Sequence, residues 1–327
     1  MNGLCKSFSA ALLCALLLAP GASAGSKEKD PDEIGNRDVG NGVNFYSIEK
    51  EIALGKQLAQ EVERQANFVD DPIVSEYVNR LGQNLARNSD AKVPFTIKVI
   101  DSSEVNAFAL PGGFMFVNTG LILKADNESE LAGVMAHEIG HVAARHGTKE
   151  ATRAELVNLA TIPLIFAGGW AGYGVREAAS AAIPIGFLKF SRSMEAEADL
   201  LGLEYMYKAG YDPESFVDFF EKIETLERTR PSAVSKLFST HPMTDDRIKA
   251  AQTNIQQLLK AQPEYVIDTS EFQDVKARLA MLENRHRLGK KDDKRPTLIR
   301  RDSGKIDDNG SQQSDDSDDR PTLKRRD

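Results

Sequence analysis

Apolar residues near the start of the folded part of the chain recur at helical spacing. Over residues 47–65 they stand mostly four positions apart, and Ser47 can cap the first turn, so this segment is predicted to be a helix. A second helix is predicted over DPIVSEYVNRLGQNLARNS, with Pro72 in its first turn and Asn88 and Ser89 just past its end.

The spacing changes to alternation in PFTIKVIDSS, where Phe95, Ile97 and Val99 are apolar, and this segment is predicted to be a strand. NAFALPGGFMFVNTGLI follows as a hairpin-like pair that turns at residues 111–113. The pattern therefore predicts an α+β protein, mainly helical with a small β-sheet. Further helices are predicted over 127–146, 194–209, 213–228, 245–259 and 272–285.

The N-terminal segment has the layout of an export signal. An apolar run over residues 10–19 and small residues ending at Ala24 predict that residues 1–24 are a secretory signal peptide, cleaved after Ala24. Lipidation at Cys14 is the alternative, and it is disfavoured because Leu13 is not the small residue that such processing requires. We therefore expect a periplasmic location.

Composition agrees with an exported globular protein. The chain has 327 residues, 41% of them apolar, which is enough for a core. Cys5 and Cys14 are its two cysteines and both lie in the segment to be removed, so no disulfide is expected. The formal charge of −8 and the absence of a basic cluster in the body of the sequence disfavour nucleic acid as a partner.

Four further ranges complete the predicted organisation. Residues 25–44 form a lead-in loop, and residues 45–288 form the folded domain. The apolar region 156–189 is broken by proline and glycine, so core helices and a mobile flap are favoured over membrane contact, and membrane association is not required. The charged tail 289–327 is predicted to be disordered.

The tail contains a repeat, because RPTLIRRD at 295–302 recurs as RPTLKRRD at 320–327. Either this is a duplicated solvated tail, or it is a linear motif in two copies that binds a partner with avidity.

The chemistry of the chain begins with HEIGH in the helix predicted over 127–146. His137 and His141 are four residues apart, so they project from one helix face and can bind zinc together, while Glu138 lies beside the metal as a base. The alternative is a helix that merely carries two histidines, since this motif arises by chance in roughly one protein of this length in a hundred. His146 lies off this face and is predicted to be a helix-end residue.

A hydrolytic zinc site needs a third protein ligand and keeps a fourth position open. SRSMEAEADLLG supplies Glu195 and Asp199 on one helical face, whereas Glu197 points away from them. We predict that Glu195 is the third ligand of one zinc ion per chain. Asp199 is then expected to accept the outer N–H of a ligand histidine.

Four segments, NAFALPGGFMFVNTGLI, HEIGHVAARH, SRSMEAEADLLG and STHPMTDDRI, occur in this order. Together they resemble the zinc metallopeptidases of the HtpX and BepA type, relatives of the CAAX prenyl endopeptidases, over roughly residues 47–259. The resemblance implies a zincin-like fold with the zinc site on the HExxH helix. It implies zinc ligands at His137, His141 and Glu195, a general base at Glu138, and Asp199 behind the site.

The resemblance also adds residues that the pattern alone does not single out. It implies that His241 lies near the zinc, where it stabilises the oxyanion together with Arg247 or occupies the open coordination position. It further implies that an extended substrate pairs with an edge strand next to the turn, which we place at Phe114, Met115 and Phe116.

The expected activity is zinc-dependent hydrolysis of peptide bonds in unfolded or misassembled envelope proteins. The membrane helices of the prenyl endopeptidases and the helical repeat domain of BepA-type proteins have no counterpart in the sequence, so neither feature's role in substrate choice carries over. One alternative is a latent protease that binds clients like a chaperone while His241 caps the zinc. A purely structural zinc module is disfavoured because only three strong ligands are visible.

Overall fold

The computed structural model describes residues 30–156, 190–229, 241 and 244–292. The predicted signal peptide, nearly all of the apolar region 156–189 and the tail from residue 293 lie outside these residues. Within the described part of the chain, no helix has both the length and the apolar character that a membrane crossing demands.

The first elements lie where the apolar pattern predicts them. Helix α1 (Ile48–Gln65) begins after Ser47, whose hydroxyl accepts a hydrogen bond from the Lys50 N–H, and α2 (Pro72–Arg87) begins after Asp71. The strands are β1 (Thr96–Ile100), β2 (Ala107–Leu110) and β3 (Phe114–Asn118). A 3-10 turn η2 (Pro31–Glu33) precedes α1, and the later helices are α3 (Thr119–Lys124), α4 (Glu128–Ala143), α8 (Arg192–Lys208), α9 (Glu214–Thr229), α11 (Asp245–Leu258) and α12 (Ser270–Asp292).

The three strands form one sheet in the order β1-β3-β2. The hairpin is confirmed, since β2 and β3 are antiparallel, while β1 pairs in parallel with β3. The prediction of an edge strand at Phe114, Met115 and Phe116 is wrong, because these residues lie on β3, whose two sides are both paired. The edge of the sheet next to the turn is β2.

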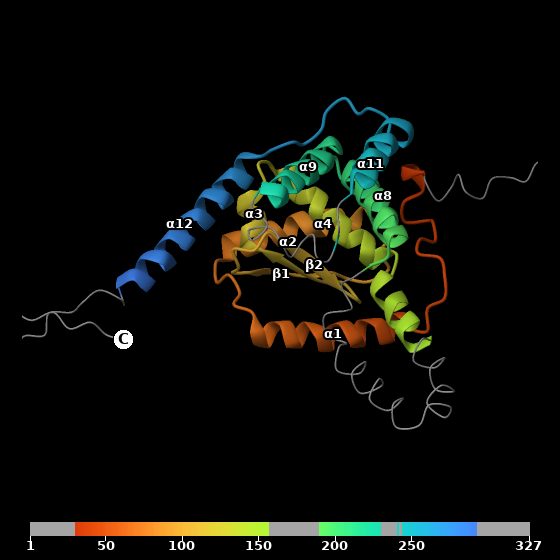
Figure 1. Ribbon diagram of the computed structural model, residues 1–327, viewed down its shortest axis with the longest axis horizontal. Coiled ribbons are helices and arrows are strands. Elements are labelled where there is room, and N and C mark those ends of the chain that lie inside the picture. Colours follow the sequence, from red (N-terminus) through yellow and green to blue (C-terminus); the bar gives the residue numbers. More distant parts are fainter. Residues whose placement is uncertain (1–29, 157–189, 230–240, 242–243, 293–327) are drawn as a thin grey trace, which may run out of the picture.

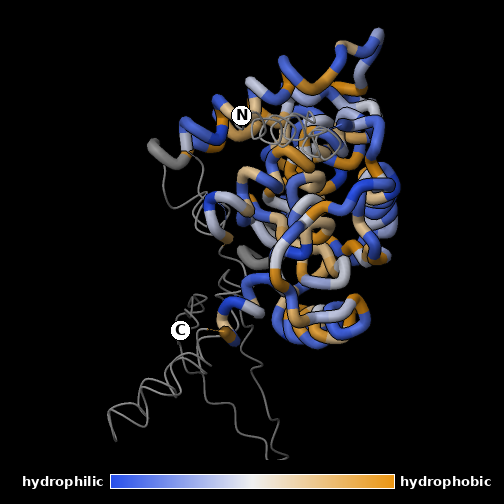
Figure 2. Tube along the Cα trace, turned by 90° about the vertical axis from the view of Figure 1, so that its right-hand side faces the viewer, coloured by the Kyte–Doolittle hydropathy of each residue, from blue (hydrophilic) through white to orange (hydrophobic). Residues whose placement is uncertain are grey.

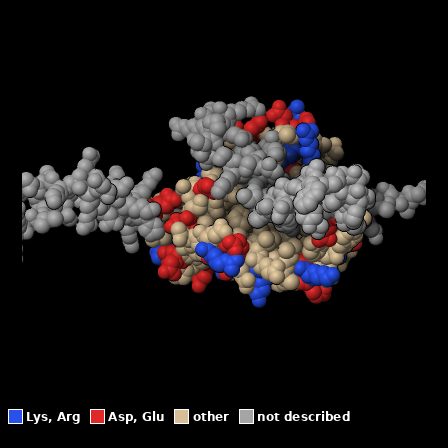
Figure 3. All heavy atoms as spheres, turned by 60° about the horizontal axis from the view of Figure 1, so that its bottom comes forward, with Lys and Arg blue, Asp and Glu red and all other residues tan. Residues whose placement is uncertain are grey.

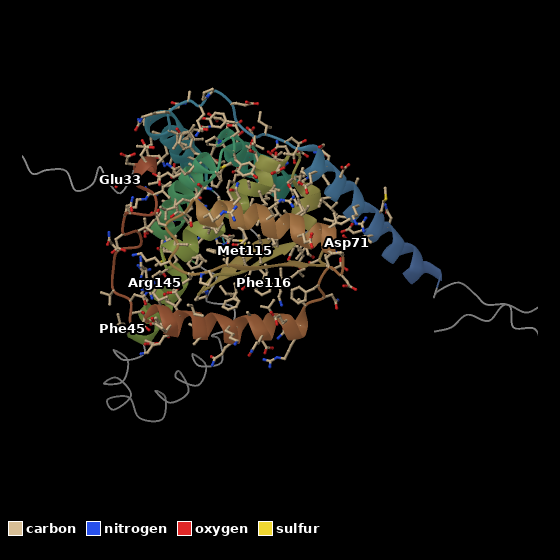
Figure 4. All side chains as sticks on the ribbon, turned by 180° about the vertical axis from the view of Figure 1, so that it is seen from behind. Glu33, Phe45, Asp71, Met115, Phe116 and Arg145 are labelled. Carbon is tan, nitrogen blue, oxygen red and sulfur yellow. The ribbon has the colours of Figure 1, made fainter. Side chains whose placement is uncertain are left out.

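The sheet lies between two helical layers, with α1 on one face and α2 and α4 on the other (Figure 1). Met115 and Phe116 lie on opposite faces of β3 (Figure 4), and each belongs to a different apolar cluster. Phe116 packs against α1 with Ile100, Leu110 and Ala59. Figure 2 shows apolar and polar stretches alternating along the tube, as amphipathic helices around a shared core require. The mainly helical α+β class is therefore confirmed.

The lead-in segment is bound to the domain through a buried ion pair. Arg37 donates to Asp90 Oδ2 at 2.9 Å and also pairs with Glu204 on α8. The Tyr205 hydroxyl donates to the same Asp90 oxygen at 2.9 Å. Burial would lower the pKa of the Arg37 guanidinium, but the two carboxylates raise it, so the charge is kept. The described part of the lead-in is therefore a loop held in place by charge pairing.

Helix α4 ends earlier than the pattern predicts. It stops at Ala143 rather than near His146, and Arg145 has a φ of 57°. The Arg145 side chain holds this left-handed backbone conformation, because it donates to Glu51 Oε2 at 2.6 Å and to the Tyr46 carbonyl at 2.5 Å. Arg145 lies near the start of α1 in Figure 4. Helical structure resumes at His146.

Charged side chains are mixed on the face that carries α1. Figure 3 shows Lys and Arg separated by Asp, Glu and uncharged residues among the described atoms of this view. This mixture is typical of a solvated surface.

Candidate metal centre

Helices α4 and α8 cross closely because glycines stand at their contact. A Cβ on Gly140 would lie 2.9 Å from the Ala198 carbonyl oxygen, and one on Gly202 would lie 2.9 Å from the His137 backbone nitrogen. The two backbones therefore touch directly. This contact brings the histidines of α4 (His137 and His141) next to the acidic residues of α8 (Glu195 and Asp199).

Gly202→Ala should push α8 away from His137. We expect the free energy of unfolding to fall by about 1–3 kcal/mol, because backbone atoms cannot move aside as a flexible side chain can, and zinc affinity to fall with it. Denaturant unfolding and chelator competition measure the two effects. Gly133→Ala on α4 is the control, since its Cβ would meet mainly the Phe216 side chain at 3.3 Å. Equal losses in both variants would contradict the proposed role of the close crossing.

Four buried side chains direct possible ligand atoms at one point. His137, His141, Glu195 and His241 each offer one atom, and these atoms lie within 4.8 Å of one another. The Nε2 atoms of His137 and His141 are 3.1 Å apart, and His241 Nδ1 lies 3.4 Å from His137 Nε2 and 3.0 Å from Glu195 Oε1. The structure thus brings together the three predicted ligands and His241, the residue that the resemblance implies near the zinc.

These distances fit a zinc ion. Ligand nitrogens about 2.0–2.1 Å from a tetrahedral zinc are about 3.3 Å apart, close to the separations in this cluster. Two imidazole nitrogens at this distance must share a proton or a metal ion, because two lone pairs that face each other in a buried site repel. The donor set of histidine nitrogens and a carboxylate is also the set that zinc prefers.

The electrostatics of the cluster also favour a cation. Burial would lower the pKa of His137, but Asp199 and Glu195 outweigh it and raise that pKa to about 9. Burial would likewise raise the pKa of Glu195, but His137 and His241 hold it well below the usual range. The carboxylates therefore stay ionised and attract positive charge to this point.

Glu138 lies beside the cluster with one oxygen fixed and one free of hydrogen bonds. Its Oε2 accepts from the Ala109 N–H of β2 at 3.0 Å. Its Oε1 makes no hydrogen bond and lies 3.5 Å from His241 Nε2. Burial raises the pKa of Glu138, which makes this carboxylate a stronger base. The arrangement suits a general base that the sheet edge holds in place.

Asp199 and Arg247 lie behind the ligands. Asp199 Oδ1 lies 3.0 Å from His137 Nδ1, which is an ion-pair distance. The Nδ1 atom makes no hydrogen bond in this geometry. Arg247 donates two 2.7 Å hydrogen bonds to Asp199, and its Nη1 lies 3.0 Å from Glu195 Oε2. Arg247 is thus placed to orient these carboxylates, and its contact with an oxyanion stays a prediction.

The sequence pattern missed the role of His146. This residue is buried and contacts both His141 and Glu197 instead of capping a helix end. Phe190 also stacks on the His141 ring, with centroids 4.1 Å apart. The helix break at Arg145 reorients His146, and no spacing signal indicates such a break.

Comparisons with known proteins agree with this geometry. The chain is 31% identical over 260 residues to the beta-barrel assembly-enhancing protease of Yersinia pestis and 30% identical over 283 residues to that of Escherichia coli K12. These alignments cover 76% and 84% of this chain and 53% and 56% of the relatives, so the chain spans about half the length of these proteins. Metalloprotease LoiP of Escherichia coli K12 is 32% identical over 198 residues, which cover 59% of this chain and 76% of LoiP.

The family model described as Peptidase family M48 matches residues 72–255. The matched range contains the HExxH helix, Glu195, His241 and Arg247. It also begins at the first residue of α2 and ends within α11. The resemblance predicted from four short segments is thus confirmed over more than half of the chain, and the protein belongs to peptidase family M48.

Proposed function

We propose that this protein is a zinc-dependent endopeptidase that binds one zinc ion per chain and hydrolyses peptide bonds in periplasmic or envelope proteins. The observation that carries this proposal is the convergence of His137, His141 and Glu195 at one buried point with Glu138 beside them. Three protein ligands of this type and an adjacent carboxylate are the arrangement that hydrolytic zinc sites use.

Each residue has a role that follows from its place. Zinc bound at this site would supply a Lewis acid that polarises a carbonyl and makes water more acidic. Glu138 takes a proton from the attacking water through its free Oε1 and returns it to the leaving amine. His241 Nε2 lies 3.5 Å from that oxygen and makes no hydrogen bond, so it can donate to an oxyanion when it carries a ring proton.

Strand β2 offers the position for the substrate backbone. It is the edge strand on the side of Glu138, because the Ala109 N–H reaches that carboxylate. An extended segment added alongside β2 would lie next to the base and the ligand cluster. Unfolded segments satisfy this requirement more readily than folded proteins, which supports unfolded or misassembled proteins as substrates.

The location and partners belong to the same proposal. The signal-peptide pattern of residues 1–24 supports export to the periplasm. The relatives named beta-barrel assembly-enhancing protease support a role in quality control of envelope proteins. We also propose that the repeated tail motif binds a partner. Nucleic acid is not proposed as a partner.

Metal analysis and cleavage of an unfolded protein test the proposal together. The purified chain should contain one zinc ion and should cut a permanently unfolded protein at internal bonds. A chelator should stop the cleavage, and added zinc should restore it. Cleavage that persists after complete metal removal would refute a zinc-dependent mechanism.

The position of His241 favours a second candidate, a latent protease that mainly binds clients. Its Nδ1 lies 3.4 Å from His137 Nε2 and 3.0 Å from Glu195 Oε1, in the same cluster as His141, so His241 can close the position that a substrate needs. For this candidate we expect His241→Ala to increase cleavage while zinc stays bound. Initial cleavage rates at equal zinc content measure the effect. A decrease instead would assign His241 to oxyanion stabilisation and favour the plain enzyme.

A further inference from the structure

We propose that His146 and Glu197 are positioning residues that orient the ligand His141 through a chain of two hydrogen bonds. This inference rests on the proposed zinc site. His146 Nδ1 lies 2.9 Å from His141 Nδ1, and His146 Nε2 lies 3.1 Å from Glu197 Oε2. The His146 side chain is fully buried, whereas the Glu197 side chain is 38% exposed. The chain thus runs from the metal cluster toward solvent.

The three groups admit one arrangement of protons when His141 binds metal. His141 Nε2 faces the cluster, 3.1 Å from His137 Nε2, and must present a lone pair there. Its proton is then on Nδ1, which donates to His146 Nδ1. His146 therefore carries its own proton on Nε2, which donates to the Glu197 carboxylate. The carboxylate thus selects one tautomer in His146 and, through it, one in His141.

The fold holds both ends of this chain. The break at Arg145 turns His146 back toward His141, which a continued α4 would not do, because residues five apart do not share a helix face. The other oxygen of Glu197 accepts from the Gly40 N–H at 3.2 Å. Gly40 has a φ of 77°, and a Cβ there would lie 2.3 Å from the Ala144 carbonyl oxygen. The lead-in loop therefore packs on the helix break and holds Glu197.

The two histidines of HEIGH are supported differently. His137 has a carboxylate, Asp199, directly behind it, and Arg247 orients that carboxylate. His141 reaches its carboxylate, Glu197, only through a second imidazole. The alternating acidic residues of α8 thus divide into a ligand, Glu195, and one support for each histidine. Glu197 points away from Glu195 on the helix, and this places its carboxylate next to His146 Nε2.

Zinc affinity, measured by competition with a chelator, tests this relay directly. His146→Leu should weaken zinc binding about 10- to 100-fold, because support of a ligand histidine is lost. His146→Asn should lose less, since its amide oxygen can still accept from His141 Nδ1. The zinc affinity of Glu197→Gln should lie between those of the wild type and His146→Leu, because the amide oxygen accepts a hydrogen bond but carries no charge. The absorption spectrum of the cobalt-substituted protein should change in the same order.

Lys149→Met is the matched control. Lys149 also ties the lead-in loop to this turn, by donating to the Asn41 carbonyl at 3.0 Å, and its charge acts on His146 and Glu197 without a hydrogen bond to either. The zinc affinity and cobalt spectrum of Lys149→Met should therefore stay much closer to those of the wild type than those of His146→Leu. Thermal unfolding in excess chelator shows whether each variant folds. If His146→Leu does not fold, Glu197→Gln still tests the relay.

Two results would overturn the relay. One is a wild-type zinc affinity and cobalt spectrum in folded Glu197→Gln and His146→Asn. The other is an equal loss in Lys149→Met, which would trace the effect to the loop. A wild-type chain that binds no zinc is a distinct result, because it would overturn the proposed function itself and the relay with it.

Discussion

Glu138→Gln should lower peptide-bond hydrolysis about 100- to 10,000-fold while zinc stays bound, because general base catalysis contributes about this factor. Glutamine has the same shape, and its amide oxygen can still accept from the Ala109 N–H that holds Oε2 at 3.0 Å. The amide cannot take a proton at neutral pH. None of the ligand atoms is altered, so binding and chemistry are separated in this variant.

Cleavage of an unfolded protein at equal zinc content measures the loss. Glu130→Gln provides the control, since Glu130 lies on the same helix and is buried, but pairs with Lys222 away from the cluster. It should retain wild-type activity. Full activity in Glu138→Gln with zinc bound would remove Glu138 from the mechanism. Because the inactive variant should hold substrates without cutting them, proteins trapped by it in the envelope would identify the natural substrates.

Asp199→Asn should weaken zinc affinity about 10- to 100-fold and also destabilise the fold. The affinity falls because the carboxylate behind His137 loses its charge. The stability falls by about 3–5 kcal/mol because Arg247 loses a buried partner that now makes two 2.7 Å hydrogen bonds. Its remaining contact with Glu195 places the expected value toward the lower end of this range.

Adding Arg247→Met to Asp199→Asn separates the two effects. The double variant no longer buries a guanidinium that has lost its Asp199 partner, so it should recover part of the stability but not the zinc affinity. Chelator titration measures the affinity, and denaturant unfolding in excess chelator measures the stability. Zinc content that stays at the wild-type level through the chelator titration would show that Asp199 does not support His137.

The elements with strong local patterns could be predicted without a structure. The helix over 47–65 and the hairpin around residues 111–113 appear where apolar spacing, caps and turn residues indicate them. The pair at His137 and His141 is also local, because four residues of helix place two side chains on one face. Glu195 and Asp199 could be proposed for this pair because a hydrolytic zinc needs a third ligand and a supporting carboxylate. His241 and Arg247 could be proposed only through the resemblance to a family.

The errors all involve contacts between segments far apart in the sequence. The alternation in residues 114–118 indicates a strand but not its neighbours, so the sequence predicts an edge strand there although β1 pairs with the other side of β3. The break after Ala143 depends on Glu51 and Tyr46, which are about 100 residues away. The role of His146 depends in turn on that break.

The sequence by itself determined the elements and indicated the two histidines proposed to bind metal and the proposed base, because helix periodicity and capping act over a few residues. Only the tertiary structure decided which strand lies at the edge, how Arg247 is used and what supports His141. The reason is physical: the close crossing of α4 and α8 at Gly140 and Gly202 and the buried ion pairs join residues whose separation along the chain carries no periodic signal.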